Sequence, residues 1–435
     1  MTTKLDSYWM PFTGNRQFKR DPRMIVAAEG AYYTSADGRK IFDGLSGLWN
    51  CGAGHGVREI RDAIGKQAAT LDYAPAFQFG HPSAFALADR VKSYMPEGLE
   101  SVFFTNSGSE AVDTALKIAL AYWRVRGQAN KARLVGRMRG YHGVNFGGIS
   151  VGGIAANRKM YRQSVEVDHL TDTVIAGNEF TRGMPERGAE LADELKKVIA
   201  LHDASNIAAI IVEPLAGSTG VLPPPRGYLK KLREICDAND ILLIFDEVIT
   251  GFGRMGARTG AEAFGVVPDL MCVSKQLTNG VMPMGAVVAH KKVYDAFMQG
   301  GQEYAPEFAH GYTTSGHPLA CAAGLATLDL LERDQLIARV RELAPVLERA
   351  VHGIKGVPWV TDIRNYGLAA ALTFEAAPGE PALRPFQVAM KMWSKGFYVR
   401  YGGDTIQLGP PFVSTPAELD SLCSALGDSI REAAR

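Results

Sequence analysis

A lysine and an aspartate each follow a short apolar segment. Asp246 comes directly after residues 241–245, and Lys275 follows residues 270–273 with only Ser274 between. A desolvated lysine loses its proton more readily, and the neutral amine is the nucleophile that forms a Schiff base. A carboxylate that keeps a pyridine nitrogen protonated makes the ring an electron acceptor. The pair therefore predicts chemistry with a pyridine cofactor, although for Lys275 alone, contact with solvent or with an acid explains the position equally well.

The segment Asn106-Ser-Gly-Ser-Glu-Ala111 is a candidate binding site for the phosphate of such a cofactor. A predicted strand runs into this turn of small residues, and a predicted helix, 111–123, follows it. The first turn of a helix has free amides and a positive dipole end, which favour anions. Ser107, Gly108 and Ser109 are therefore candidate phosphate ligands, with an ordinary serine N-cap as the alternative.

Tyr141 and His142 follow another predicted strand, with a glycine on each side, and Glu213 follows a third. The glycines would let the face of Tyr141 lie flat on a ring, although packing is the commoner role of a single tyrosine. None of the nine histidines has metal-ligand spacing such as H-E-x-x-H, so we expect no metal.

The segment LLIFDEVITGFGRMG (242–256) allows two other interpretations. A magnesium-binding acid of a nucleotide hydrolase requires a G-x-x-x-x-G-K-[ST] loop, which the sequence lacks. A dinucleotide-binding G-x-G-x-x-G must open a helix directly after its strand, whereas residues 246–250 separate the strand from Gly251. We expect a glycine-rich loop here. The G-x-S-x-G at 148–152 is also expected to be a loop, without a serine nucleophile.

Short apolar segments alternate with longer amphipathic ones such as 187–202. Continuously apolar segments of this length are typical of strands buried on both faces of a parallel sheet, so the fold class is α/β. Because ligands bind at the carboxyl ends of such strands, we expect the residues named above to meet at one site. The predicted strands are 102–105, 133–136, 207–212, 241–245, 270–273 and 285–289.

The two ends of the chain have a different character. Beyond about residue 330 come a predicted helix at 335–354, a strand at 367–374 and a loop-rich tail at 399–412. Residues 27–43 have a pattern typical of strands joined by a turn, and we predict that they join this part. We therefore expect an N-terminal segment, 1–55, and a C-terminal part, 329–435, to form a small domain beside a large domain, 56–328.

Composition favours a small-molecule partner. The 47 Lys and Arg residues nearly balance the 46 Asp and Glu residues, and no run of like charges forms a nucleic-acid or membrane patch. The five cysteines are scattered, without a C-x-x-C pair, as in proteins of a reducing cytosol. Neither an apolar leader nor a run near the ~18 residues of a membrane span is present. We expect a soluble cytoplasmic protein.

With these residues assembled, the chain resembles the class-III, fold-type I pyridoxal-phosphate aminotransferases over nearly its whole length, from SYWMPF to GGDTIQLGPPF. The most specific stretch is LLIFDEVITGFGRMG with PDLMCVSKQLTNGVMPMGAV, which joins Asp246 to Lys275 at the family's spacing. Within the family it is most similar to the omega-amino acid:pyruvate (β-alanine:pyruvate) enzymes, on stretches such as LSGLWNCGAGH, FQFGHP, GYHGVN and HGYTTSGHP.

The resemblance implies a large domain with a mainly parallel sheet and a smaller α+β domain built from both termini. It implies a role for each candidate. Lys275 would form the Schiff base, Asp246 would bind the ring nitrogen, and Val248 and Tyr141 would lie on the two faces of the ring. Ser107, Gly108 and Ser109 would hold the phosphate, with Thr313 reaching in from a second subunit, and His142 and Glu213 would complete the cofactor site.

For the substrate pocket, the resemblance implies Phe12, Trp49, Phe77 from the partner chain, and Arg400 as the carboxylate-binding residue. The unit would be a homodimer with shared active sites, with a tetramer left open. One position departs from the family pattern: Thr314 stands where HGYTYS has tyrosine.

The implied reaction moves an amino group from a β-alanine-type donor to pyruvate, giving alanine. Two alternatives use the same scaffold, a 2-oxoglutarate-dependent class-III aminotransferase and an aminomutase. A remote alternative is an NAD(P)-dependent oxidoreductase that uses the glycine-rich loop beside Asp246.

Overall fold

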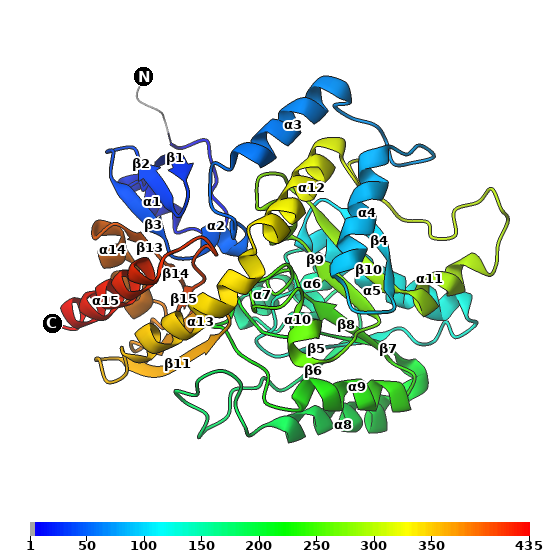
Figure 1. Cartoon of the computed structure of the whole chain (residues 1–435). Helices are drawn as coiled ribbons and strands as arrows, with labels where there is room; N and C mark the ends of the chain where they lie inside the picture. Colours follow the sequence, from blue (N-terminus) through cyan, green and yellow to red (C-terminus); the bar gives the residue numbers. More distant parts are fainter. Residues whose placement is uncertain (1–4) are drawn as a thin grey trace.

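The computed structural model describes residues 5–435, and a seven-stranded sheet forms its centre (Figure 1). Strand β10 runs antiparallel to β4 and β9, and the other neighbouring strands pair in parallel, as predicted. All the predicted central strands lie in this sheet. The additional strand β6 was missed because its sequence, VDHL, is half polar. The spatial order is β4 (Leu99–Thr105), β10 (Gly285–His290), β9 (Leu270–Val273), β8 (Leu242–Asp246), β7 (Ile207–Val212), β5 (Arg133–Arg137), β6 (Val167–Leu170).

Strand β8 shows how the sheet positions its polar ends. Leu242 and Ile244 pack in one apolar cluster with helix α5 (Gly108–Val125), whereas Leu243 and Phe245 pack in another with helix α9 (Tyr228–Ala238). Side chains along a strand alternate between the two faces. Asp246, the next residue in this alternation, therefore falls on the same side as α5.

Helices cover both faces of this sheet. The predicted helix 187–202 begins as a 3-10 turn, η1 (Ala189–Asp193), and continues as α8 (Glu194–His202). Helix α12 (Pro318–Arg333) lies beside α3 (Arg58–Thr70) and α4 (Pro82–Tyr94). Together with α13 (Leu336–His352), α12 runs between the sheet and the part formed by the chain ends (Figure 1). The remaining elements around the sheet are α6 (Phe146–Val151), α7 (Ala155–Tyr161), η2 (Ala204–Asn206), α10 (Gly260–Phe264), η3 (Lys275–Thr278) and α11 (Lys291–Met298).

The two ends of the chain share a four-stranded sheet, in which β1 (Ile25–Glu29), β2 (Tyr32–Ser35) and β3 (Lys40–Asp43) continue into β13 (Phe397–Tyr398). Strand β13 runs parallel to β3. Near them lie two short helices, α1 (Asn15–Arg20) and α2 (Ser46–Trp49).

A third sheet has the order β11 (Val360–Tyr366), β12 (Ala369–Phe374), β15 (Thr405–Leu408), β14 (Arg400–Gly402), and α13 (Leu336–His352), α14 (Leu383–Ser394) and α15 (Pro416–Ala433) accompany it. The tail 399–412, predicted to be loop-rich, instead contains the antiparallel pair β14 and β15. These strands are too short to show a pattern, and β15 is buried because it also pairs with β12.

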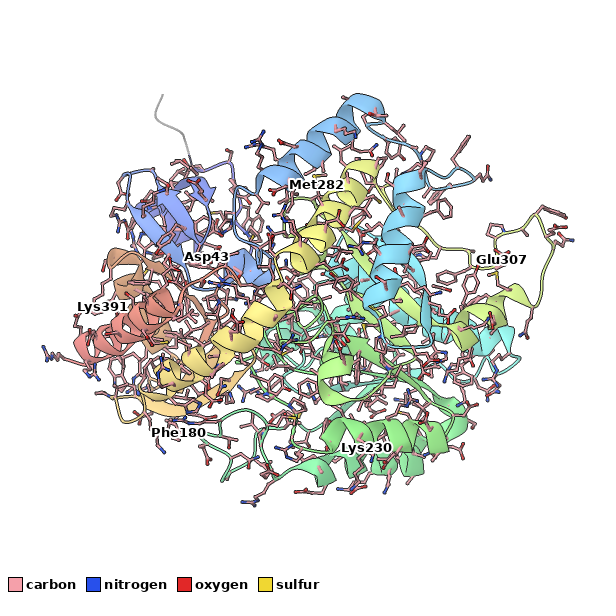
Figure 2. The ribbon with its side chains drawn as sticks, in the orientation of Figure 1. Asp43, Phe180, Lys230, Met282, Glu307 and Lys391 are labelled. Carbon is pink, nitrogen blue, oxygen red and sulfur yellow. The ribbon has the colours of Figure 1, made fainter. Side chains whose placement is uncertain are left out.

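A buried arginine joins the chain ends to the central sheet. Arg254 is 1% exposed and donates to the carbonyls of Leu368 (3.2 Å) and Pro410 (2.6 Å) and to Ser46 Oγ (3.0 Å). Its guanidinium also lies 4.6 Å from the ring centroid of Phe412. Figure 2 shows the side chains of the whole described chain, with Asp43 and Lys391 on the part that the chain ends form. Arg254 therefore fixes three segments, distant in sequence, against one another.

Among residues 5–435, no helix is long and apolar enough to cross a membrane. The same residues contain no cluster of His, Cys, Asp and Glu suited to a metal ion.

Candidate active site

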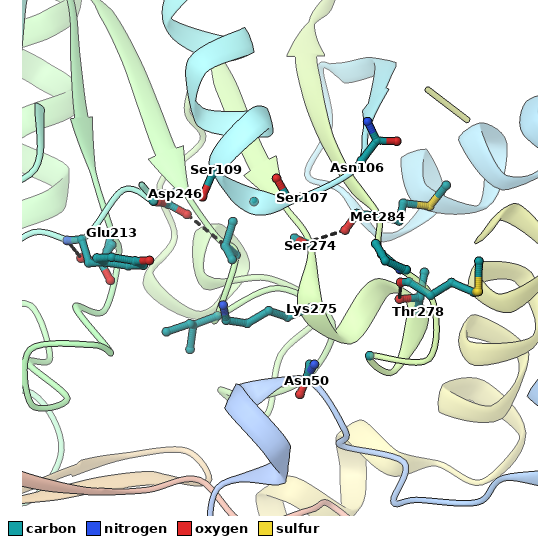
Figure 3. A pocket seen from close by; sticks show the side chains of 18 residues that line it. Asn50, Asn106, Ser107, Ser109, Glu213, Asp246, Ser274, Lys275, Thr278 and Met284 are labelled. Atoms are coloured by element: carbon teal, nitrogen blue, oxygen red, sulfur yellow. Dashed lines mark hydrogen bonds between the residues drawn. The ribbon is translucent and has the colours of Figure 1, made fainter. Parts of the chain in front are cut away.

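A cavity of about 410 Å³ lies where strand ends of the central sheet meet the start of α5 (Figure 3). This volume is within the range of small-molecule sites. The sequence-predicted residues that line it are Ser107, Gly108, Ser109, Tyr141, Glu213, Asp246, Val248 and Lys275. Residues predicted from separate segments of the chain are thus brought together.

The start of α5 is held by reciprocal hydrogen bonds. The Glu110 amide donates to Ser107 Oγ (3.2 Å), and the Glu110 carboxylate accepts from the Asn106 amide (2.7 Å) and from Asn106 Nδ2 (2.9 Å). The first amides of a helix have no acceptor within it, so this fixed turn presents donors to an anion.

Asp246 is fixed from two sides. Its Oδ2 lies 2.9 Å from His142 Nδ1, and its Oδ1 accepts from the Val248 amide (3.1 Å). Because a carboxylate only accepts, His142 carries its proton on Nδ1. His142 is 1% exposed, and its Nε2 has no hydrogen-bond partner within residues 5–435. His142 thus lies behind Asp246 and orients its carboxylate.

Lys275 follows β9 in a left-handed backbone conformation, with φ of +44°. Such a conformation costs about 1–2 kcal/mol for a residue with a side chain. Burial lowers the pKa of the Lys275 amine, and the charge of Arg400 acts in the same direction, whereas Asp246 and Glu213 oppose this change. Nζ makes no hydrogen bond or ion pair with any described residue, so the amine is available to react with a ligand.

Glu213 supports the backbone at Tyr141. Its carboxylate accepts from the amides of Tyr141 (2.9 Å) and Gly217 (3.2 Å). Burial raises the pKa of Glu213 to about 7; Asp246 adds to this increase and His142 opposes it. Glu213 therefore fixes the peptide that carries the Tyr141 ring.

The cavity fits a phosphorylated pyridine aldehyde. It offers an amine that is available to react, a fixed carboxylate and the start of a helix. Its walls also come close together: a Cβ on Gly108 would lie 2.9 Å from both Val248 methyls, and one on Gly143 would lie 2.5 Å from Ser109 Oγ. These glycines leave room for a flat ring and its phosphate.

A second cavity, of about 790 Å³, shares Asn50 with the first and contains Phe12 and Arg400. The structure does not bring Trp49 to either cavity: its side chain is 3% exposed and packs against Gly409. The backbone of Trp49 has φ of +70°, a local turn that the sequence does not indicate.

Two of the predicted residues, Phe77 and Thr313, were expected to act from a partner chain. Both are exposed and line neither cavity of their own chain. The ring of Phe77 packs against Gly311, and the carbonyl of Thr313 accepts from Tyr73 Oη (2.8 Å). Thr314, at the departure from the family pattern, donates to Asn106 Oδ1 (2.7 Å), so it contacts a residue of the cavity wall.

Part of the cavity wall is not predicted by the sequence. Asn106 and Gly143 belong to two motifs that the sequence already indicates, 106–111 and 140–143, although no role was assigned to either residue. The others, with neutral side chains and no distinctive spacing, are Asn50, Ile249, Ser274, Thr278, Gly280, Met282, Pro283 and Met284.

Two glycine-rich motifs have structural roles. After Gly251-Phe-Gly-Arg-Met-Gly256 the chain makes turns, and the next helix is the short α10, so no helix opens at these glycines as a dinucleotide site requires. The prediction of a loop at 148–152 was wrong, because α6 covers Phe146–Val151. Ser150 Oγ there donates to the carbonyl of Phe146 (2.6 Å), a bond along the helix.

Comparison with known proteins agrees with this geometry. The family model of class-III aminotransferases matches residues 14–430, and the chain belongs to this family. Enzymes of the family depend on pyridoxal 5'-phosphate. The family, fold class and cofactor predicted from the sequence are therefore confirmed.

Two curated relatives match nearly full length. The chain is 58% identical to the beta-alanine–pyruvate aminotransferase of Pseudomonas aeruginosa, over 98% of this chain and 96% of that one. It is 57% identical to the omega-amino acid–pyruvate aminotransferase of Pseudomonas putida, over 99% and 96%. An amine transaminase from an uncultivated Pseudomonas species, solved in its PLP-bound form, superposes with a TM-score of 0.89 at 34% identity and covers 98% of both chains.

Proposed function

We propose that this enzyme transfers the amino group of an ω-amino acid, such as β-alanine, or of a related amine to pyruvate, giving alanine. The observation that carries the proposal is that the Lys275 amine, which has no hydrogen-bond partner among the described residues, lines one cavity with Asp246, whose carboxylate contacts His142. The adjoining cavity, which shares Asn50, contains Arg400. The names of the relatives at 57–58% identity support these substrates.

Pyridoxal phosphate, when bound, accepts the electron pair that remains after the donor carbon loses its proton. Lys275 would hold the cofactor through Nζ, and with a donor bound its amine would take up that proton on Nζ and return it at the neighbouring carbon. Its lowered pKa suits both roles, since burial favours the neutral amine, the form that accepts a proton.

Asp246 keeps the ring nitrogen protonated, and His142 holds the Asp246 carboxylate in place. Val248 and Tyr141 pack on the two faces of the ring, and Glu213 orients Tyr141. Ser107, Gly108 and Ser109 hold the phosphate at the start of α5.

Arg400 binds the carboxylate of pyruvate and of short ω-amino acids and swings aside for donors without one. Phe12 forms part of the same pocket. Trp49, buried beside the pocket, shapes it by supporting the neighbouring Asn50. Replacing Arg400 by alanine should raise the KM for pyruvate, and an unchanged KM would contradict this role.

The active unit is a homodimer that shares its active sites, with a tetramer left open. Thr313 and Phe77 would complete the partner's site. Exposed aromatic side chains support a subunit contact, since aromatic residues are enriched at protein interfaces. Those near the two residues in sequence are Phe79 (70% exposed), Phe85 (68%) and Tyr304 (84%).

The chain divides at about residues 55 and 328 into a terminal small domain and a large cofactor domain. The sheet that the two chain ends share supports this division. The described cysteines are all unpaired, which supports a reducing, cytoplasmic location.

The decisive experiment is the visible absorption spectrum of the purified protein and of its Lys275→Ala variant. The wild type should absorb as a lysine-bound cofactor, lose this band with β-alanine and recover it with pyruvate, whereas Lys275→Ala should show neither change. A wild type restored by 2-oxoglutarate but not by pyruvate would establish the alternative acceptor. A protein that stayed colourless after addition of pyridoxal phosphate would overturn the proposed function.

A further inference from the structure

The larger cavity contains a second arginine to which the reaction assigns no role. Arg23, between α1 and β1, lines this cavity together with Arg400. Apolar and aromatic side chains make up much of the remaining wall, including Leu48, Met390 and Trp393. The cavity thus joins a predominantly apolar wall to two guanidinium groups.

No acidic side chain lines the cavity within the described residues, although the buried Asp43 carboxylate behind the wall contributes to the raised pKa of Cys51 and of Tyr398. The residues that line the cavity include no Asp, Glu, Lys or His within the described chain. Burial raises the pKa of Cys51 and of Tyr398 to about 12 each, so both wall residues are neutral near neutral pH. The wall therefore has a net positive charge, which favours a ligand with an apolar body and an anionic group.

Arg23 is held in place without using all of its donors. One terminal nitrogen donates to the carbonyl of Asp21 (3.2 Å) and the other to Gln17 Oε1 (3.0 Å). The guanidinium carbon lies 5.2 Å from the ring centroid of Phe18. No carboxylate among residues 5–435 pairs with Arg23. A guanidinium has five N–H donors, so several remain for a ligand.

Arg400 and Arg23 come from different elements. Arg400 begins β14, whereas Arg23 lies between α1 and β1, and both line the same cavity. The charge of Arg400 also lowers the pKa of Lys275, which lines the adjoining cavity. The larger cavity therefore offers a carboxylate two separate positions.

We propose that Arg23 is a second carboxylate-binding residue, which receives the far end of long-chain ω-amino acids. The amine of such a substrate lies at Lys275, its methylene chain lies along the apolar wall, and its carboxylate binds Arg23. Short donors and pyruvate use Arg400 instead. This inference rests on the proposed aminotransferase function and extends its substrates to long, amphipathic amino acids.

The test compares three donors with saturating pyruvate on the holoenzyme. 8-Aminooctanoate has a long chain and a carboxylate, octylamine has the same chain without a carboxylate, and β-alanine has a carboxylate close to the amine. The variants are Arg23→Gln and Arg23→Lys. Arg16→Gln is the matched control, because it removes the same charge from an exposed position of α1 outside the cavity.

We expect Arg23→Gln to raise the KM for 8-aminooctanoate about fivefold, the size expected for a partly solvated ion pair. The kcat and the KM values for octylamine and β-alanine should stay as in the wild type. Arg23→Lys should recover part of the loss, and Arg16→Gln should change nothing. Equal cofactor absorbance in all variants would show that each holds the cofactor.

An equal rise of the KM for octylamine would mean that Arg23 only shapes the apolar wall, and an unchanged KM for 8-aminooctanoate would equally overturn the proposal. Either result, with β-alanine activity intact, would leave the aminotransferase function standing. A wild type without activity on any of these donors would overturn both.

Discussion

Replacing Gly143 by alanine should weaken cofactor binding, because the new methyl group would overlap with Ser109. Gly143 has φ of +88°, a conformation that costs about 1–2 kcal/mol for a residue with a Cβ. The new methyl would also lie 2.5 Å from Ser109 Oγ and 2.7 Å from Ser109 Cα. Relieving such an overlap by shifting Ser109 typically costs a further 1–3 kcal/mol or so.

The control variant is at the opposite end of α5, the helix whose first turn contains Ser109. Gly127, just beyond α5, has φ of +77°, and a Cβ there would meet nothing within 4 Å. Both alanine variants should therefore lose the same backbone contribution to the free energy of unfolding. Only Gly143→Ala should displace Ser109 from the phosphate position.

The assay is a titration of each apoenzyme with pyridoxal phosphate, followed by absorbance, together with the thermal unfolding of the apoenzymes. We expect the dissociation constant of Gly143→Ala to rise at least about tenfold, which corresponds to ~1.4 kcal/mol, while that of Gly127→Ala stays unchanged. If Gly143→Ala bound the cofactor as tightly as Gly127→Ala, Ser109 would not hold the phosphate.

Two other predictions concern stability. Burial raises the pKa of Glu247 from 4.5 to about 7. Between these two pH values, the folded protein therefore binds a proton at Glu247 that the unfolded chain has released. The free energy of unfolding of the apoenzyme should fall as the pH rises through this interval. Denaturant titrations between about pH 5 and pH 8 would measure this, and a slope equal to that of Glu247→Gln would contradict it. Arg254→Met removes the donor to two carbonyls and to Ser46, and should lower the free energy of unfolding by ~3 kcal/mol or more, with Arg254→Lys between it and the wild type. Equal melting temperatures of all three proteins would exclude this role of Arg254.

The centre of the fold was predictable because parallel strands bury both faces. A continuous apolar segment that ends in a reactive residue indicates both a strand and the side of the sheet where ligands bind, as for Asp246 and Lys275. Local sequence was less informative where distant segments decide the structure. Strand β15 is a strand because β12 pairs with it, and Trp49 turns into the core through an unusual backbone angle.

The pairing of β3 with β13 has a consequence for the order of assembly on the ribosome. The first strands of the protein leave the ribosome early, whereas their parallel neighbour, Phe397–Tyr398, is among the last segments to be made. Translation also reaches Arg400 late. The same is true of the two carbonyls that accept from Arg254, those of Leu368 and Pro410. The nascent large sheet therefore forms before the substrate wall, and contacts of such long sequence separation form slowly. A chain that stops before Phe397 lacks Arg400 and the last part of the cavity wall proposed to bind the substrate.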